Sequence, residues 1–211
     1  MHYGASGKVH GTQFTEPTAV VIKHTNPCGL AIHSDQVTAY QHAFRGDSVS
    51  AYGGIVGFNR SVTAATAEAM KGVLYDIIVA PGYEASALAV LKKRRRCRIL
   101  QIIPQSGLLQ HLDVHLVSGG ALFQTTDAVE EDPSSWDIVT ERRPTEAELK
   151  DLDLAWKVAK HIKSNAIVLA KESAMVGMGA GQPNRVTSVH LALRIAGKNA
   201  KDSVLASDAF F

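Results

Sequence analysis

The sequence predicts an α/β fold, in which strands alternate with helices along most of the chain. Short apolar runs have the composition of buried strands, for example Thr18–Lys23 and Gly54–Phe58. Segments with apolar residues at helical spacing follow such runs, as in Asp35–Arg45. Turn-forming pairs such as Gly53-Gly54 and Pro81-Gly82 separate the elements. Strands and helices that alternate at this interval favour a mostly parallel sheet covered by helices.

The elements of the first part can be assigned in order. The strand Thr18–Lys23 leads into a turn expected at Asn26-Pro27. The helix Asp35–Arg45 follows, because its apolar residues recur at helical spacing. The remaining elements expected here are the strand Gly54–Phe58, the helix Ala64–Lys71, the strand Asp76–Ala80, the helix Ala85–Arg95 and the strand Arg98–Ile103.

A change of pattern after Pro104 predicts a second part. Short strand-like pieces, separated by polar turns, are expected at Val114–Val117, Ala121–Gln124 and Trp136–Thr140. A helix then begins at Thr145, where Thr145-Glu146-Ala147-Glu148 forms a capping-box pattern. Its core face is expected to hold Leu149, Leu152, Trp156 and Ala159, and a strand is expected at Ala166–Ala170. We therefore expect two units, residues 1–143 and 144–211.

Composition excludes several classes of protein. With 45% hydrophobic and 20% charged residues, the chain resembles ordinary soluble domains, and a net charge of +2 gives no reason to expect nucleic acid or a membrane surface as a partner. Cys28 and Cys97 match no disulfide or zinc spacing, which favours a reducing compartment. The polar start does not resemble a secretory signal, and no apolar run approaches the roughly 18 residues of a membrane span. A soluble, cytoplasmic protein is the expectation.

The basic run at 92–98, KKRRRCR, allows two interpretations. It could bind nucleic acid or serve as a nuclear-targeting segment. It could also be a solvated helix end, where cations complement the negative end of the helix dipole. Because no aromatic residues are interleaved with the basic ones, we favour the solvated helix end.

Four polar or glycine-rich segments stand where strands are expected to end, which is where ligands bind in open α/β sheets. They contain Lys23-His24, Tyr52-Gly53-Gly54, Asp76, and the pair of stretches KSNAIVLAK and GMGAGQPNR, the latter ending in Arg185. Each also has a structural explanation, as a polar strand edge or a turn. GMGAGQ lacks the Lys-Ser/Thr of a phosphate-binding P-loop.

Long motifs carry a resemblance to a known family. VIKHTNPCG, SVSAYGGIVGFNR, DIIVAPGYE, KSNAIVLAK, GMGAGQPNRVTSV and SDAFF follow one another between Ala19 and Phe211. In this order they resemble the formyltransferase domain of the bifunctional purine biosynthesis family, which joins AICAR transformylase to IMP cyclohydrolase. The resemblance implies cytidine-deaminase-like three-layer α/β units, the first near complete and the second truncated, with the cyclohydrolase domain absent.

The resemblance also implies an activity, the transfer of a formyl group from 10-formyltetrahydrofolate to the 5-amino group of AICAR in IMP biosynthesis. His24 matches the family's base and Lys23 its neighbouring cation. An aromatic amine is a poor nucleophile, so a base must take its proton while a cation stabilises the developing charge. By the same matching Asn165 orients the formyl or carboxamide group, and Asp208 lies near the transfer centre.

Further implications concern binding and assembly. Tyr52, Gly53, Asp76 and Arg185 are expected to line the nucleotide site. The expected partners are AICAR and folate, with a homodimer as the assembly, and a structural potassium ion is compatible with the resemblance.

Two other classes of function stay open. A zinc deaminase would need H-x-E and P-C-x-x-C ligands, and the segment NPCGLA supplies only one cysteine, so we expect no zinc. The chain could instead be a truncated, inactive remnant that folds and binds nucleotide or a partner chain without turnover. Restoring the missing C-terminal segment and testing formyl transfer would separate the enzyme from the remnant.

Overall fold

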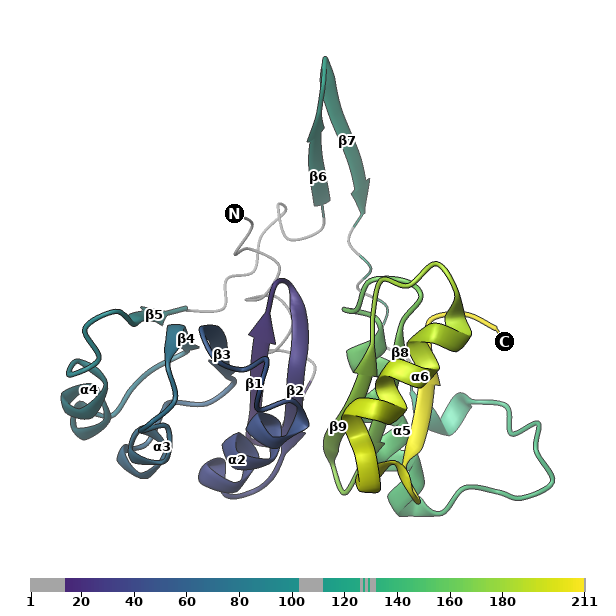
Figure 1. Ribbon diagram of the computed structural model, residues 1–211, viewed down its shortest axis with the longest axis horizontal. Helices are drawn as coiled ribbons and strands as arrows, with labels where there is room; N and C mark the ends of the chain where they lie inside the picture. Colours follow the sequence, from purple (N-terminus) through teal and green to yellow (C-terminus); the bar gives the residue numbers. More distant parts are fainter. Residues whose placement is uncertain (1–13, 103–111, 126, 128, 130–131, 211) are drawn as a thin grey trace. The chain divides into compact units, whose positions relative to one another are not determined.

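The computed structural model describes residues 14–102, 112–125, 127, 129 and 132–210 (Figure 1). Contacts divide the chain into a larger unit, residues 1–102 and 140–211, and a smaller unit, residues 103–139. The predicted division into residues 1–143 and 144–211 stays a prediction. Ile103, the last residue of one predicted strand, lies outside the described residues.

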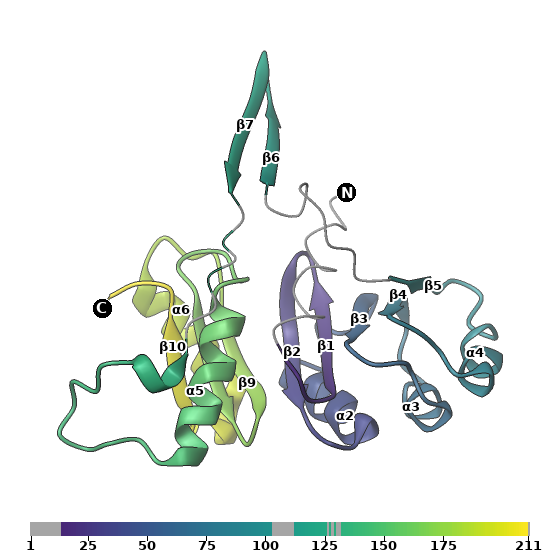
Figure 2. The same ribbon diagram turned by 180° about the vertical axis from the view of Figure 1, so that it is seen from behind.

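The larger unit is built on one eight-stranded sheet with the order β10-β8-β9-β2-β1-β3-β4-β5 (Figures 1 and 2). Its strands are β1 (Thr18–Lys23), β2 (Asn26–Ile32), β3 (Gly54–Phe58), β4 (Tyr75–Ala80), β5 (Arg98–Gln101), β8 (Ile167–Lys171), β9 (Ala174–Gly179) and β10 (Val204–Ser207). Its helices are α2 (Gln36–Gly46), α3 (Ala64–Ala69), α4 (Ala85–Leu91), α5 (Glu146–Ala159), α6 (Arg185–Ala196) and the 3₁₀ helix η3 (Gly197–Ala200).

The sheet is mixed, so the prediction of a mostly parallel sheet was wrong. Only β3–β4 and β4–β5 pair in parallel, and the other pairings are antiparallel. A helix connects each parallel pair, whereas two-residue turns connect β1 to β2 and β8 to β9. The turn predicted at Asn26-Pro27 is also wrong, because the chain turns at His24-Thr25. Pro27 lies in β2 beside a register shift, a position in a strand that proline tolerates.

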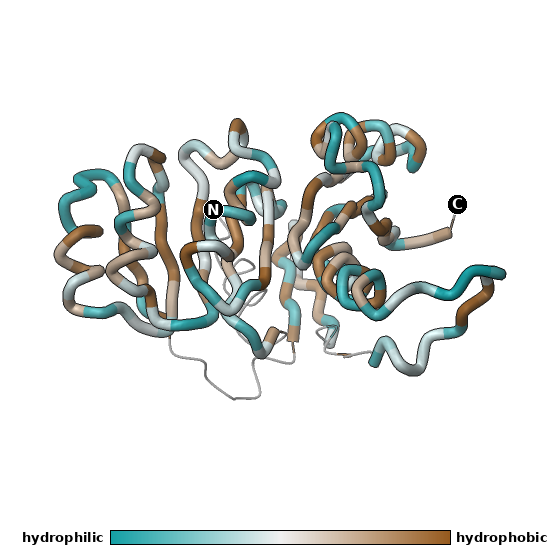
Figure 3. The backbone as a smooth tube through the Cα atoms, turned by 90° about the horizontal axis from the view of Figure 1, so that it is seen from below, coloured by the Kyte–Doolittle hydropathy of each residue, from teal (hydrophilic) through white to brown (hydrophobic). Residues whose placement is uncertain are grey.

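Helices cover both faces of this sheet. Along β1, Ala19 and Val21 pack in the cluster that α2, α3 and α4 cover, whereas Val20 and Ile22 pack in the cluster beneath α5. Burial on both faces explains why β1 is apolar from Ala19 to Ile22. Figure 3 shows that hydrophobic stretches alternate with hydrophilic ones along the backbone. On β8, alternate residues face α5 and α6. The α/β class is therefore confirmed.

Helix caps agree with the sequence better than helix faces do. Asp35 caps α2 by accepting from the Thr38 N–H, and the capping box of Thr145 and Glu148 is present at the start of α5. The predicted core face of α5 was largely wrong, because the buried residues are Leu154, Ala155, Val158 and Ala159, whereas Trp156 is 40% exposed. The strand predicted at Trp136–Thr140 is not formed.

The smaller unit contains a two-stranded hairpin, β6 (Leu112–Val117) and β7 (Gly120–Thr125), and the 3₁₀ helix η2 (Pro133–Ser135). The hairpin confirms the strands predicted at Val114–Val117 and Ala121–Gln124. Of the helices that the structure describes, none has the length and apolar character needed to cross a membrane.

Candidate functional site

The turn between β1 and β2 presents the Lys23-His24 pair. His24 and Thr25 form this two-residue turn with φ of +49° and +72°, and both residues are exposed. The left-handed region is unfavourable for residues with a Cβ, and more so for a β-branched threonine. The end of β1 thus places an imidazole on a strained turn next to a lysine.

A second turn of the same kind provides a comparison. Glu172 and Ser173 join β8 to β9 with φ of +54° and +58°, and the Asp151 carboxylate accepts from both of their N–H groups at 2.9 and 2.7 Å. The described contacts of the 24–25 turn contain no such side-chain support. Left-handed residues other than glycine concentrate at functional sites, which makes this turn a candidate.

Lys23 is held by the peptide that joins Tyr52 to Gly53. Its Nζ donates to the Tyr52 carbonyl oxygen, and the Gly53 N–H of the same peptide donates to the Leu74 carbonyl oxygen at 2.8 Å. Gly53 has φ of +67°, and a Cβ at this position would lie 3.2 Å from the Lys23 Nζ. Glycine therefore supplies both the conformation and the space that the ammonium group occupies.

Strand pairing explains why these residues lie close together. Ile22 of β1 pairs antiparallel with Ile55 of β3, and Gly54 pairs in parallel with Tyr75 of β4. The carboxyl end of β1 therefore meets the amino ends of β3 and β4. The expectation that all candidate residues follow strands was wrong for Gly53 and Asp76, because Gly53 precedes β3 and Asp76 is the second residue of β4.

Asp76 and Tyr52 occupy this edge in different ways. Asp76 is exposed, and among the described residues no hydrogen bond or ion pair joins it to Lys23. Tyr52 contributes its backbone carbonyl to the contact with Lys23, while the residue itself is 63% exposed.

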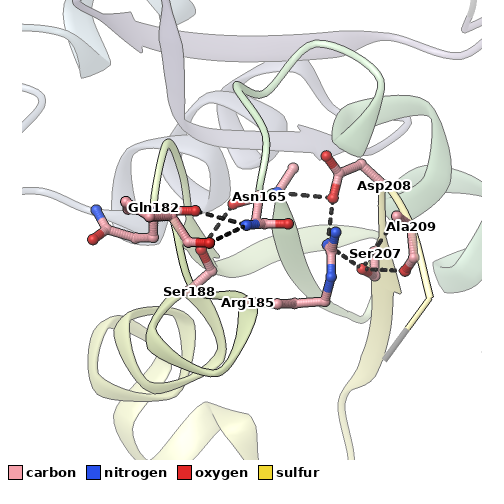
Figure 4. Close-up of polar contacts among 9 residues, drawn as sticks. Asn165, Gln182, Arg185, Ser188, Ser207, Asp208 and Ala209 are labelled. Atoms are coloured by element: carbon pink, nitrogen blue, oxygen red, sulfur yellow. Dashed lines mark hydrogen bonds and ion pairs between the residues drawn. The ribbon is translucent and has the colours of Figure 1, made fainter.

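Asn165 belongs to a second cluster (Figure 4). Its side-chain Nδ2 donates to the carbonyl oxygens of Gln182 and Pro183, at 2.8 and 3.1 Å, and the Ser188 hydroxyl donates to the Asn165 carbonyl oxygen at 2.8 Å. With its amide N–H groups used in this way, the Asn165 side chain offers Oδ1 as an acceptor.

Arg185 and Asp208 form an ion pair in the same cluster (Figure 4). The Arg185 Nη1 lies 2.5 Å from the Asp208 Oδ1 and donates to the Ser207 hydroxyl at 2.8 Å, while the Asp208 Oδ1 accepts from the Ala166 N–H at 3.0 Å. Burial alone would raise the pKa of Asp208, but the hydrogen bonds from Ser164, Arg185 and Ala166 outweigh it and lower that pKa. The carboxylate thus ties the start of α6 to the end of β10.

Register places both clusters at one end of the sheet. Ala31 of β2 pairs antiparallel with Ala174 of β9, so the 24–25 turn and the carboxyl end of β9 lie at the same end. Ile167 pairs with Gly179 and with Ser207, which puts Asn165 and Asp208 there as well. The described residues provide no hydrogen bond between the two clusters.

One polar atom at this end was missed by the sequence analysis. The Asn26 Oδ1 is buried and has no hydrogen-bond partner among the described residues. Asn26 pairs with Lys23 at the base of the turn, so a buried acceptor lies where a ligand or water could satisfy it. Asparagine before proline was interpreted as a turn residue, which concealed this signal.

The described residues lack a cluster of side chains that could hold a metal ion. They contain no group of three or more His, Cys, Asp or Glu arranged to hold a metal ion. Two buried side-chain oxygens lack hydrogen-bond partners there, Asn26 Oδ1 on β2 and Asp153 Oδ1 on α5. One oxygen at each place does not make the several-oxygen shell of a hard cation. The potassium ion and the absence of zinc stay predictions.

Comparison with known proteins gives a consistent result. The family model for the AICARFT/IMPCHase bienzyme matches residues 5–195. Bifunctional purine biosynthesis protein purH of Dictyostelium discoideum is 48% identical over 209 residues, covering 94% of this chain and 39% of that protein. The PurH proteins of Listeria monocytogenes and Trichodesmium erythraeum are 46% and 49% identical, covering 95% and 92% of this chain. The chain spans about 39% of the length of the first two relatives and 38% of the third.

Proposed function

Because this chain belongs to the AICARFT/IMPCHase bienzyme family, we propose that it supplies formyl-transfer residues of de novo purine (IMP) biosynthesis. The reaction moves a formyl group from 10-formyltetrahydrofolate to the 5-amino group of AICAR. The observation that carries this proposal is the strained, exposed turn that holds His24 beside an anchored Lys23. In the family to which the chain belongs, a base and a cation at these positions fit the chemistry.

The transfer needs one proton acceptor and one stabiliser of negative charge. The amine nitrogen of AICAR forms a bond to the formyl carbon, His24 takes the proton that this nitrogen loses, and the bond from the formyl carbon to the folate N10 breaks. Lys23 lies next to His24 and stabilises the oxyanion that forms after the attack and collapses as the bond to N10 breaks. N10 leaves with the proton that His24 took from the amine, so His24 is neutral again after the transfer. Because Lys23 is already bound to the Tyr52 carbonyl, little reorganisation is needed.

The second cluster suits orientation of the nucleotide. The free acceptor of Asn165 is Oδ1, so it orients a donor such as the amine or the carboxamide N–H. Arg185 gives Nη1 to Asp208 and Ser207, so Nη2 and Nε are the donors left for the phosphate. Asp208 therefore acts by holding Arg185, and its place near the transfer centre stays a proposal.

The wider proposals follow the family. The chain would fold as cytidine-deaminase-like units and form a homodimer in the cytoplasm. Its partners would be AICAR and folate. Gly53, Tyr52 and Asp76 would line the nucleotide side of the site. These proposals rest on the sequence resemblance and on family membership.

Ligand binding tests the proposal. We expect calorimetry to show that the chain prefers AICAR to cytidine and to a dinucleotide, because the family's substrate is a ribotide. Preference for cytidine or a dinucleotide would overturn the proposal. Binding of AICAR without formyl transfer, even after the chain is joined to the remaining length of a relative, would favour the non-catalytic alternative.

A further inference from the structure

One arginine of the basic run 92–98 is turned toward the protein. Arg94 Nη1 donates to the Val73 carbonyl oxygen at 2.8 Å, and its Nη2 donates to the Met70 carbonyl oxygen. Its guanidinium carbon lies 6.0 Å from the centre of the Tyr75 ring, within reach of a cation–π contact. The neighbouring Arg95 is exposed. For Arg94, the interpretation of the run as a solvated helix end was therefore wrong.

The segment that Arg94 holds, residues 70–74, carries a contact of the candidate site. The Leu74 carbonyl oxygen accepts from the Gly53 N–H at 2.8 Å. The segment is fixed on both sides, because Met70 at its start and Tyr75 directly after it are fully buried. The Tyr75 hydroxyl also lies 2.9 Å from that of Tyr40. Between Met70 and Tyr75, the backbone passes through a left-handed glycine at residue 72, with φ of +85°.

The peptide between Tyr52 and Gly53 transmits this support to Lys23. The N–H of this peptide donates to the Leu74 carbonyl oxygen, and this hydrogen bond fixes the orientation of the peptide plane. The carbonyl oxygen of the same peptide therefore faces the Lys23 ammonium. We propose that Arg94 is a positioning residue for Lys23, acting through residues 70–74 and the 52–53 peptide without touching the substrate. The inference rests on the proposed function only in treating the Lys23 ammonium as a group that acts on the substrate.

The geometry requires an arginine at position 94. The planar guanidinium donates from two nitrogens to two carbonyl oxygens of one turn, whereas a lysine ammonium is a point donor on a flexible stem. A lysine could keep the charge but not the double contact. An Arg94→Lys variant therefore separates the effect of the positive charge from the effect of the double contact with the two carbonyl oxygens.

The chain offers a matched control, a second arginine whose guanidinium bridges two carbonyl oxygens. Arg60 Nη1 donates to the Asn59 carbonyl oxygen at 3.2 Å and its Nη2 to the Thr15 carbonyl oxygen, beyond the carboxyl end of β3. This is the opposite end of β3 from Gly53. Removing Arg60 also breaks a two-carbonyl bridge, but it should not reach the candidate site.

The first experiment measures hydrogen exchange of the Gly53 amide in Arg94→Met, Arg94→Lys, Arg60→Met and the exposed-site control Arg95→Met. After correction for each variant's global stability, we expect Gly53 to exchange at least about tenfold faster in Arg94→Met and to be unchanged in both Met controls. Arg94→Lys should lie between Arg94→Met and the wild type. If Arg94→Met does not fold, Arg94→Lys decides, and wild-type exchange in that variant would overturn the inference.

A second readout follows the ammonium group itself. NMR of the lysine NH₃⁺ signals, with Lys23→Arg for assignment, should show the Lys23 signal exchanging faster with water in Arg94→Met but not in Arg60→Met. AICAR affinity should fall about tenfold in the same variant, the effect of losing one hydrogen bond to a charged group. Unchanged Gly53 and Lys23 signals would overturn the role of Arg94. Failure of AICAR to bind the wild type would count against the proposed function alone, because the first two readouts need no ligand.

Discussion

Thr25 occupies a backbone conformation in which glycine would be favoured. Its φ of +72° places a β-branched side chain in the left-handed region, where a residue with a Cβ loses about 1–2 kcal/mol relative to glycine. We expect Thr25→Gly to raise the free energy of unfolding by about 1 kcal/mol in urea titrations. Ser173→Gly in the other two-residue turn should give a similar gain. If Ser173→Gly stabilises the protein and Thr25→Gly does not, the left-handed conformation of Thr25 does not strain the 24–25 turn.

His24 and Lys23 should differ in what their loss removes. If His24 is the base, His24→Gln should leave AICAR affinity nearly unchanged and lower formyl transfer by roughly two to four orders of magnitude. Lys23→Met should weaken both binding and rate, because the ammonium serves a ground-state contact as well as the developing charge. Steady-state kinetics and calorimetry, in a form of the protein that shows formyl transfer, would measure both.

The pH profile adds an independent check on His24. An imidazole that accepts a proton must be neutral, so the acidic limb of the rate profile should disappear in His24→Gln. A variant that keeps most of the wild-type rate, with its acidic limb in place, would leave this mechanism without its base.

At the scale of elements, local signals were predicted and non-local ones were not. The capping box at Thr145 was recognised because its partners are three residues apart in the sequence. The antiparallel pairing of β1 with β3 depends on contacts between distant segments, and nothing in either strand sequence encodes its direction. The left-handed turn at His24-Thr25 also lacked a signal, because its residues are not the glycine or asparagine that such turns favour.

The capping box of α5 predicts an acid-sensitive increment of stability. Hydrogen bonds from Arg142, at 3.0 and 2.8 Å, and from the Thr145 backbone lower the pKa of Glu148 from 4.5 to about 2. A carboxyl group whose pKa is lower in the folded state stabilises the protein above its unfolded pKa. That contribution is lost as the pH falls from about 4.5 toward 2.

Thermal unfolding between pH 5 and pH 2 would measure this increment. We expect Glu148→Gln to lower the melting temperature at pH 5 and to lose less stability than the wild type as the pH falls. Glu146→Gln, two residues earlier in the first turn of α5 and outside the capping box, is the matched control. Equal acid sensitivity of wild type and Glu148→Gln would show that the carboxylate contributes nothing in this range.

At the scale of the whole molecule, motif order named the candidate residues but could not reveal the contacts that they make. Lys23 and Gly53 lie close together, and the link is a backbone carbonyl of Tyr52, which no side-chain pattern could reveal. Asn165, Arg185 and Asp208 belong to one cluster, and the hydrogen bonds that each of them makes restrict which atoms are free for a ligand. Arg94 illustrates the same limit, since its neighbours in sequence are solvent-exposed cations and only the fold turns it inward.

The smaller unit bears on the prediction that the protein self-associates. In the β6–β7 hairpin, Val114 pairs with Phe123 and Leu116 with Ala121, so these apolar side chains lie on one face. Leu116 and Phe123 are 86% and 68% exposed. A two-stranded hairpin is marginally stable by itself, and an exposed apolar face favours association.

We therefore expect light scattering of the purified chain to show a dimer or a larger species. Replacing Leu116 and Phe123 together with serine should shift the mass toward that of the monomer, because the substitution removes apolar surface without altering the strand pairing. Gln124→Ser is the matched control, since Gln124 pairs with Asp113 on the opposite face of the hairpin. A wild-type protein that stays monomeric at high concentration would contradict self-association. Association that survives the double serine variant would place the contact outside this face of the hairpin.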